Sequence, residues 1–320
     1  MANRIPAPEQ TPDGPAYEGR LLARPDDEVV DQGAGFDLRT LMSRRSVFSV
    51  LGLGAAAAVL AACAPKSGTS LPTAASTGAP TAAPTTSGAL PAGEIPDETA
   101  GPYPGDGSNG PDALAESGIV RSDLRTDIGG GDPVDGVPLT FTLRLTDMAD
   151  GDAAFAGVAV YAWHCDALGR YSLYSEGVED RTWLRGVQVA DGDGQVTFTS
   201  VIPGCYAGRW PHIHFEVYPD ADAIDDSANA IATSQLALPE SALTPVYAQS
   251  AYDGSARNLA QVSIASDGVF GDDGGALQIA TVTGDATTGY TATLTVRVDT
   301  GTEPTGGGMG GGPGGEPPRG

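Results

Sequence analysis

Strict alternation of apolar and polar side chains is the feature that most limits how this chain can fold. Residues 139–145 read Leu-Thr-Phe-Thr-Leu-Arg-Leu, and residues 290–298 keep the same pattern. Because successive side chains of a β-strand point to opposite faces, each segment presents one apolar face and one polar face. Shorter segments that also favour strands are 158–163, 196–199 and 213–218. Each of these segments is therefore predicted to form a strand.

Turn-forming residues separate the predicted strands, at 150–151, 166–169, 191–194 and 284–289. No segment keeps a 3.6-residue apolar period, although residues 241–250 could form a short helix. Many short strands at this spacing predict an all-β fold. We expect a β-sandwich of short mixed or antiparallel strands with long loops, flanked by disordered termini.

The sandwich is predicted to occupy residues 94–300. The segment before it, 63–93, is almost entirely Ala, Pro, Thr, Ser and Gly, and the segment after it, 301–320, is rich in Gly and Pro. Such segments bury too little apolar surface to offset the entropy lost on ordering. We therefore predict a flexible linker before the sandwich and a disordered tail after it.

Residues 1–62 resemble an export signal. Arg44 and Arg45 follow a serine, as in a twin-arginine signal, and residues 47–62 form an uncharged run. This run is too short to span a ~30 Å hydrocarbon core comfortably, and its small residues are typical of a signal peptide. An uncleaved transmembrane anchor is the alternative. The residues before Arg44 contain Pro, Gly and acidic side chains without an apolar period, so we predict them to be disordered.

The uncharged run ends in Leu-Ala-Ala-Cys at residues 60–63, which resembles the cleavage box of a bacterial lipoprotein. The resemblance implies that Cys63 becomes the first mature residue and carries the lipid. It also implies that the protein is exported and anchored to the outer face of the cell membrane.

The formal net charge of the chain is −24. Binding to a phosphate backbone requires clustered Lys and Arg, so the acidity excludes nucleic acid as a partner. A solvated surface is the expected role of most of this charge.

Two of the three histidines in the chain, His212 and His214, lie on one predicted strand. Side chains two residues apart on a strand share a face, so both imidazoles can reach one metal ion. Glu216 follows on the same face, which permits a cupin-like metalloenzyme with two histidines and one carboxylate. Against this alternative, three such residues span about 13 Å, since each residue rises ~3.3 Å.

Two tyrosines accompany the histidines. Tyr206 lies within Pro-Gly-Cys-Tyr-Ala-Gly-Arg-Trp-Pro-His-Ile-His at residues 203–214, and Tyr171 ends Trp-His-Cys-Asp-Ala-Leu-Gly-Arg-Tyr at residues 163–171. Together these segments resemble the intradiol ring-cleavage dioxygenases, the family of catechol 1,2- and protocatechuate 3,4-dioxygenase. The order of both tyrosines, both histidines and Arg209 follows the family pattern.

The resemblance implies one non-haem Fe(III) per chain, held by Tyr171, Tyr206, His212 and His214. It implies that Tyr206 leaves the ion when substrate binds, and that Arg209 stabilises negative charge on the bound ring. The segment 98–103 resembles the pocket element of the family, with Thr99, Gly101, Pro102 and Tyr103 facing the substrate. The expected reaction joins a small aromatic diol and O2 and gives a muconate-type diacid.

Phenol chemistry agrees with these roles, because a phenol of pKa ~10 is ionised at neutral pH only beside a strongly Lewis-acidic ion. The interval between Tyr206 and His212 is shorter than in the best-known members, and a helical amino-terminal dimerisation region is absent. These departures leave the substrate and the oligomeric state open. A lipid-tethered β-sandwich that binds ligands without turnover is the non-enzymatic alternative.

Cys165 and Cys205 each lie close in sequence to one of these tyrosines. If both tyrosines approach one ion, their segments must be neighbours in space. Because an exported protein meets an oxidising compartment, we predict a Cys165–Cys205 disulfide. His164 matches no family role and is predicted to be structural.

Overall fold

The computed structural model describes residues 9–11, 14–17, 20–21 and 90–304. The chain divides into two compact units, residues 1–86 and 87–320. The predicted export signal, the linker and Cys63 lie outside the described residues, apart from the short strands of the first unit and residues 90–93 at the end of the linker. Of the predicted tail, only residues 301–304 are described.

In the first unit, three short strands form an antiparallel sheet: β1 (Glu9–Thr11), β2 (Gly14–Tyr17) and β3 (Arg20–Leu21). These strands fall within the segment before Arg44 that was predicted to be disordered.

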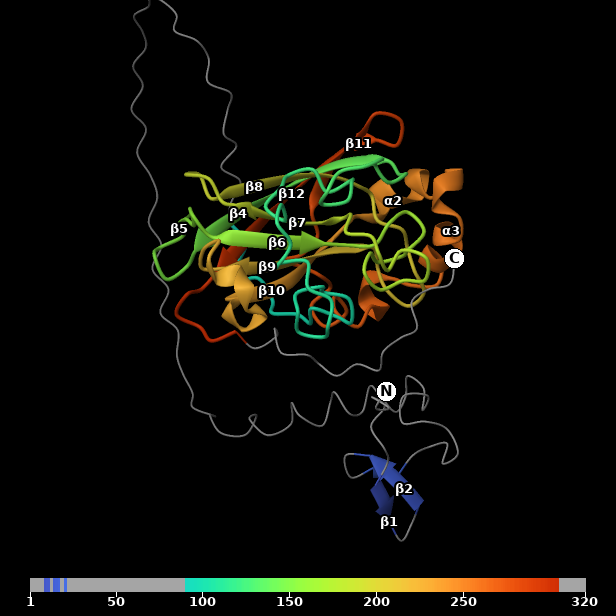
Figure 1. Ribbon diagram of the computed structural model, residues 1–320, viewed down its shortest axis with the longest axis horizontal. Coiled ribbons are helices and arrows are strands. Elements are labelled where there is room, and N and C mark those ends of the chain that lie inside the picture. Colours follow the sequence, from blue (N-terminus) through green and yellow to red (C-terminus); the bar gives the residue numbers. More distant parts are fainter. Residues whose placement is uncertain (1–8, 12–13, 18–19, 22–89, 305–320) are drawn as a thin grey trace, which may run out of the picture. The chain divides into compact units, whose positions relative to one another are not determined.

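The second unit contains two sheets (Figure 1). The four-stranded sheet has the order β10-β9-β6-β7 and is antiparallel throughout. Its strands are β6 (Ala159–Trp163), β7 (Arg185–Val189), β9 (His212–Tyr218) and β10 (Ala232–Ala237).

The five-stranded sheet has the order β11-β12-β4-β5, and β8 pairs with β4. Its strands are β4 (Pro138–Asp147), β5 (Ala153–Ala154), β8 (Gln195–Val201), β11 (Thr281–Asp285) and β12 (Gly289–Val298). Because β12 runs parallel to β4 whereas the other pairs are antiparallel, the sheet is mixed. The predicted all-β sandwich is confirmed.

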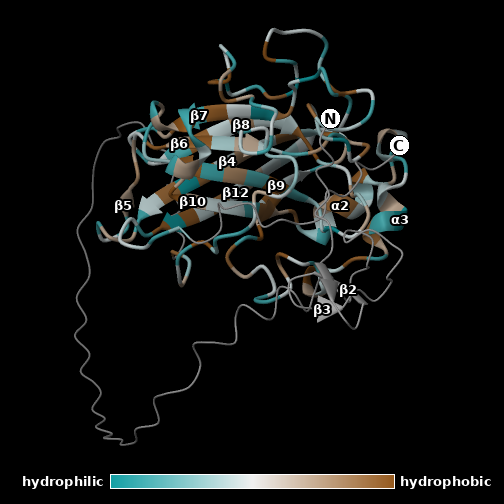
Figure 2. Cartoon of the chain, turned by 60° about the horizontal axis from the view of Figure 1, so that its bottom comes forward, coloured by the Kyte–Doolittle hydropathy of each residue, from teal (hydrophilic) through white to brown (hydrophobic). Residues whose placement is uncertain are grey.

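The main core lies between the two sheets. Buried and more exposed residues alternate along β4 and β12, as the sequence pattern predicts. Phe141 and Phe198 stack there with ring centroids 5.0 Å apart, in the same apolar cluster as Phe215 of β9. Figure 2 shows the apolar colour alternating with polar colours along the strands.

Three strands of the four-stranded sheet are buried on both faces, since every residue of β6, β9 and β10 is buried. Its second face carries Trp163 and Tyr161, which pack in a second apolar cluster with residues from 100–128 and 165–174. Polar side chains of β9 on this face therefore lie inside the protein and not on its surface.

Short helices follow β9 and β10: α2 (Glu240–Val246), α3 (Ser255–Leu259) and the 3-10 turns η2 (Ala223–Asp225), η3 (Ser227–Asn229), η4 (Ser250–Tyr252) and η5 (Ile264–Ser266). The short helix predicted at 241–250 corresponds mainly to α2. Among the described residues, no helix is both long enough and apolar enough to cross a membrane.

Candidate active site

His212 and His214 point from β9 into the second buried face of the four-stranded sheet, and each is at most 3% exposed. Their Nε2 atoms lie 3.1 Å apart. The His212 Nδ1 atom contacts the Trp210 carbonyl, which can only accept a hydrogen bond. His212 therefore carries its proton on Nδ1 and leaves a lone pair on Nε2. The His214 ring stacks on Trp163 of β6, with centroids 4.9 Å apart and planes 7° apart.

Tyr206 lies in the loop between β8 and β9, and its hydroxyl is 3.3 Å from Nε2 of His212. This loop packs tightly against the loop after β6. The Gly204 N–H donates to the Asp166 carbonyl at 2.9 Å, and a Cβ on Gly204 would lie 2.5 Å from the Ala167 carbonyl oxygen. Only glycine permits this approach, which brings the two predicted tyrosine segments side by side.

Tyr171 lies in a turn closed by Ser175, whose hydroxyl accepts the Tyr171 N–H at 2.8 Å. The Tyr171 ring is 1% exposed and meets Tyr206 and His214 edge-on, with centroids 6.0 and 6.3 Å apart. Its hydroxyl is buried and has no hydrogen-bond partner among the described residues. The structure thus brings all four predicted ligands together.

Burial controls the protonation of this group. Burial, and then the proximity of Tyr206, hold the pKa of Tyr171 well above its ordinary value. Burial also raises the pKa of Tyr206 to about 12, although the charge of Arg209 opposes the shift. Burial and then Arg209 lower the pKa of His212 to about 3, and burial with the neighbouring His212 lowers that of His214. Both imidazoles are therefore neutral near pH 7.

These donors fit a ferric ion. The two facing imidazole nitrogens and the unpartnered Tyr171 hydroxyl are groups that a cation would satisfy. A cation also lowers the pKa of a neighbouring phenol, which offsets the effect of burial. Two phenolate oxygens and two imidazole nitrogens form a ligand set for a hard, highly charged metal ion.

Glu216, the carboxylate of the alternative metal site, follows His214 on β9 but is bonded to a different partner. Its Oε2 atom accepts a hydrogen bond from the Tyr218 hydroxyl at 2.8 Å. Burial, and then Asp106, raise the pKa of Glu216 to about 8. Within the part of the chain that the structure describes, no three His, Cys, Asp or Glu side chains gather as a metal site. The predicted alternative with two histidines and one carboxylate does not form there.

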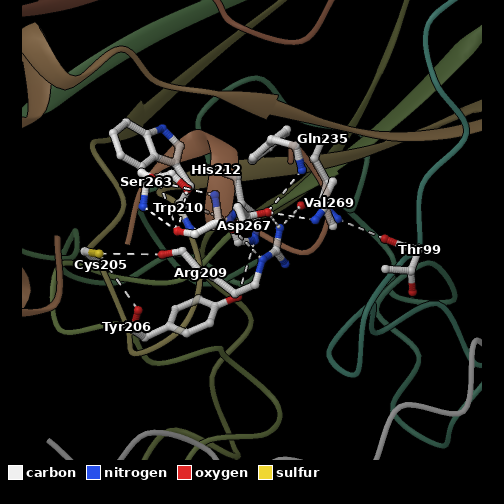
Figure 3. Close-up of polar contacts among 12 residues, drawn as sticks. Thr99, Cys205, Tyr206, Arg209, Trp210, His212, Gln235, Ser263, Asp267 and Val269 are labelled. Carbon is white, nitrogen blue, oxygen red and sulfur yellow. Dashed lines mark hydrogen bonds and ion pairs between the residues drawn. The ribbon is translucent and has the colours of Figure 1, made fainter. Parts of the chain in front are cut away.

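Arg209 lies in the same loop as Tyr206 and is held by two side chains (Figure 3). Its Nε atom donates to Asp267 Oδ2 at 3.0 Å, and Nη2 donates to Gln235 Oε1 at 2.6 Å. The positive charge of Arg209 opposes the rise in the pKa of both Tyr206 and Tyr171. Arg209 therefore lies near the predicted ligands, and its predicted role on a bound ring stays a prediction.

Asp267 was not predicted from the sequence. Its side chain is fully buried beyond η5 and also accepts the Trp210 N–H at 2.6 Å. Burial alone would raise the pKa of Asp267, but the charge and hydrogen bonds of Arg209 hold it below its ordinary value. An Asp-Gly pair in a loop reads as a turn, and no local pattern connects it with an arginine 58 residues away.

The predicted pocket element lies against His214 and the Arg209 network. Thr99 Oγ1 accepts the Gly101 N–H at 3.0 Å, and the Thr99 carbonyl accepts a hydrogen bond from Gln235 Nε2 at 3.1 Å. A Cβ on Gly101 would lie 3.3 Å from Cε1 of His214. Residues 99–101 therefore cover the edge of the site.

Tyr103 and Pro102 continue this element. The Tyr103 ring packs on Tyr171 with centroids 4.9 Å apart and on Tyr174 with centroids 5.3 Å apart. Burial raises the pKa of Tyr103. Pro102 is exposed, and its carbonyl accepts a hydrogen bond from Asn109. Of the two, Tyr103 is the side chain that contacts the predicted ligands.

The predicted Cys165–Cys205 disulfide is wrong, because both cysteines are free and buried. Their segments are neighbours, as expected, but the two sulfurs face different backbone carbonyls. Cys165 Sγ lies 3.5 Å from the Gly204 carbonyl, and Cys205 Sγ lies 3.6 Å from that of Arg209. His164 is structural, as predicted: its buried ring contacts the Cys165 carbonyl and the Ser200 hydroxyl, both at 2.7 Å.

Residues 109–221 match a family model described as dioxygenase. A solved intradiol ring-cleavage dioxygenase from Tetranychus urticae is 25% identical; the match covers 66% of this chain and 97% of that one, with a TM-score of 0.52. The dioxygenase domain of a carbohydrate-binding fusion protein from Streptomyces sp. SirexAA-E is 23% identical over 65% and 99% of the two chains, with a TM-score of 0.42. No curated protein matches the chain in sequence.

Proposed function

The β-domain of this chain belongs to the intradiol ring-cleavage dioxygenases, and on that premise we propose that it is a non-haem Fe(III) enzyme. It opens a catechol-type ring with O2 and releases a muconate-type diacid. The observation that carries the proposal is the convergence of Tyr171 and Tyr206 on the facing nitrogens of His212 and His214.

Tyr171, Tyr206, His212 and His214 would hold the iron. Bound there, the ion would supply Lewis acidity: a catechol would chelate it through both oxygens as a dianion, whose electron-rich ring is reactive toward O2. The carboxylate-free donor set favours the ferric over the ferrous state, since both tyrosine oxygens are anionic in this role.

The two tyrosines differ in how firmly they are held, which supports different roles. Tyr171 is fully buried within a hydrogen-bonded turn, whereas Tyr206 is only partly buried beside the exposed residues Ala207 and Gly208. Tyr206 is therefore the ligand that can move. Its Oη atom would take the proton from a substrate hydroxyl as the substrate binds.

Arg209 orients and stabilises the reacting ring. Its guanidinium is fixed by Asp267 and Gln235 before substrate arrives, so its charge requires little reorganisation during the reaction. Such a preorganised cation stabilises negative charge that develops on a carbon or oxygen of the substrate. A ligand-binding module without turnover would not require this fixed charge, and so the arrangement favours catalysis.

Oxygen uptake and colour test the proposal together. Protein loaded with ferric iron should be red from tyrosinate-to-iron charge transfer, hold one iron per chain and consume O2 with unsubstituted or substituted catechols. Mass spectrometry of the product should find both atoms of one O2 molecule in the diacid. Colourless protein at full iron content, or coloured protein that consumes no O2 with any catechol of the panel, would overturn the proposal.

We also propose that the enzyme acts outside the cytoplasm, anchored by a lipid on Cys63. The support is the sequence alone: the arginine pair at 44–45 and the Leu-Ala-Ala-Cys box. A twin-arginine route exports folded proteins, which would allow iron to be bound before export.

A further inference from the structure

Arg185 of β7 is a fully buried arginine that the proposed chemistry does not use. Arginine is almost never fully buried unless its charge and donors are satisfied. In the part of the chain that the structure describes, its hydrogen-bond acceptors are carbonyls and hydroxyls, and none is a carboxylate. A position that keeps a buried charge without a direct counter-ion requires an explanation.

All five N–H groups of the planar, fork-shaped guanidinium of Arg185 donate a hydrogen bond. Nε donates to Ser172 Oγ at 3.0 Å. Nη1 donates to the Pro104 carbonyl and to the Tyr161 hydroxyl, the latter at 3.0 Å. Nη2 donates to the Tyr103 carbonyl at 2.9 Å and to the Ser172 carbonyl at 3.0 Å.

The two hydrogen bonds of Arg185 Nη2 connect the segment of Tyr103 with the segment of Tyr171, whose rings pack against each other. One acceptor is the carbonyl of Tyr103, and the other belongs to Ser172, the residue after Tyr171. The rings of Tyr103 and Tyr171 pack against each other with centroids 4.9 Å apart. A single nitrogen atom therefore sets the separation of the two backbones from which these rings project.

We propose that Arg185 is a positioning residue of the active site. Its guanidinium fixes the pocket segment at 103–104 against the segment of Tyr171 and so sets the orientation of the Tyr171 phenol toward His214. The relevance of this positioning to catalysis rests on the proposed function, whereas the positioning itself is a property of the metal-free chain.

Gly105, the residue after the pocket segment, leaves room for this guanidinium. Gly105 has φ of +64°, and a Cβ there would lie 2.7 Å from Nη1 of Arg185. The Gly105 N–H donates to the Tyr174 hydroxyl at 2.8 Å, and the Arg185 guanidinium carbon lies 5.5 Å from the centre of the Tyr174 ring. The backbone thus comes close to the Arg185 guanidinium at Gly105, where glycine leaves room because it has no Cβ.

Lysine cannot replace this fork. Its ammonium group has three donors on one atom, so Arg185→Lys keeps the positive charge but leaves at least two of the five contacts unmet. The substitution therefore separates the geometry of the fork from its charge. Arg297→Lys is the matched control, because Arg297 of the five-stranded sheet likewise donates hydrogen bonds through Nε, Nη1 and Nη2, to the Asp152 carboxylate and the Pro91 carbonyl, in the sheet that does not carry the histidines.

The experiment compares wild type, Arg185→Lys and Arg297→Lys. In metal-free protein, hydrogen exchange at the amides of 103–106 and 171–175 should accelerate in Arg185→Lys only. In iron-loaded protein, the charge-transfer band should shift in wavelength at unchanged iron content. With catechol, kcat should fall by up to about 10²-fold, as for other small misplacements of reacting groups, with little change in KM. Arg297→Lys should lower Tm alone.

The contrary outcome is an Arg185→Lys protein in which only Tm is lowered, while the hydrogen exchange, the wavelength of the charge-transfer band and kcat are unchanged. That outcome would refute the proposal and show that Arg185 is a structural residue. If Arg185→Lys does not fold, Tyr161→Phe replaces it: the change removes the hydroxyl that bonds Arg185 Nη1 and the Pro104 carbonyl and keeps the ring. It should then produce the same three changes at smaller size, and their absence counts equally against the proposal. Wild-type protein without colour or turnover refutes the proposed function instead, and the exchange result still decides the positioning.

Discussion

Asp267 bonds two consecutive residues through a single oxygen: its Oδ2 atom accepts the Arg209 Nε–H at 3.0 Å and the Trp210 backbone N–H at 2.6 Å. The same carboxylate accepts the N–H groups of Val269 and Phe270 through Oδ1. One buried acid thus fixes the side chain beside the ring-binding site and the backbone that leads into His212 (Figure 3). The loop after η5 is thereby part of the active site.

Asp267→Asn should lower turnover more than iron binding. The amide can no longer balance the Arg209 charge, so the guanidinium loses its fixed position, and kcat should fall by up to about 10²-fold. Breaking a buried ion pair should also cost about 3–5 kcal/mol of unfolding free energy. Iron content and steady-state kinetics check the first result, and urea denaturation checks the second. Asp152→Asn is the control. The Asp152 side chain is 24% exposed, and its partner Arg297 lies in the five-stranded sheet, away from the histidines.

The same carboxylate predicts an acid-dependent loss of stability. The pKa of Asp267 is lower in the folded protein than its ordinary value of 3.8. Such a group contributes stability above its unfolded pKa and loses that contribution as pH falls through its folded pKa. The stability difference between metal-free wild type and Asp267→Asn should therefore be full above about pH 4 and shrink below it. Thermal unfolding from pH 7 to pH 2 measures this difference, and a constant difference would contradict the assignment.

The fold was largely predictable because three of its long strands each bury one face. β4, β8 and β12 alternate in burial, and that pattern is written directly in their sequences. β10 was missed, since it is buried on both faces and reads Ala-Thr-Ser-Gln-Leu-Ala without alternation. β7 was missed because it begins with Arg-Gly, which does not favour a strand. The carbonyls and hydroxyls that allow this arginine to be buried belong to segments far away in the sequence.

The site was predictable where the spacing is local and unpredictable where it depends on the tertiary fold. His212 and His214 share a face because they are two residues apart on one strand. Asp267 and Arg185 act through contacts with residues 58 and up to 82 positions away, which no local pattern encodes. The disulfide failed for the same reason: neighbouring segments do not fix the directions of the two sulfurs.

The lipid anchor predicts a simple change in location. Cys63→Ser removes the residue that would carry the lipid, so the protein should move from the membrane fraction to the soluble fraction or remain unprocessed. Fractionation and immunoblotting of wild type and variant measure this outcome. Cys165→Ser, which alters a buried thiol in the sandwich, is the control and should leave the location unchanged. A Cys63→Ser protein that stays on the membrane in processed form would refute the anchor.

The export route is tested by the arginine pair. Replacing Arg44 and Arg45 together by lysine keeps the charge but removes the feature that a twin-arginine signal requires. The double variant should remain in the cytoplasm, where it should still bind iron, since the described domain is unchanged. Export of the double variant at the wild-type level would mean that another route carries the protein.

Tyr206→Phe and Tyr171→Phe should have different effects, because only Tyr206 lies where it can move. Tyr206→Phe should keep some iron and much of the colour while slowing substrate binding, since the base that accepts the substrate proton is lost; a loss of about 10²-fold or more is typical of general-base removal. Tyr171→Phe should instead shift the charge-transfer band and weaken iron binding in the absence of substrate. Stopped-flow spectra with catechol under anaerobic conditions separate substrate binding from the reaction with O2. Identical spectra and rates for the two variants would show that the difference in burial between these tyrosines has no functional meaning.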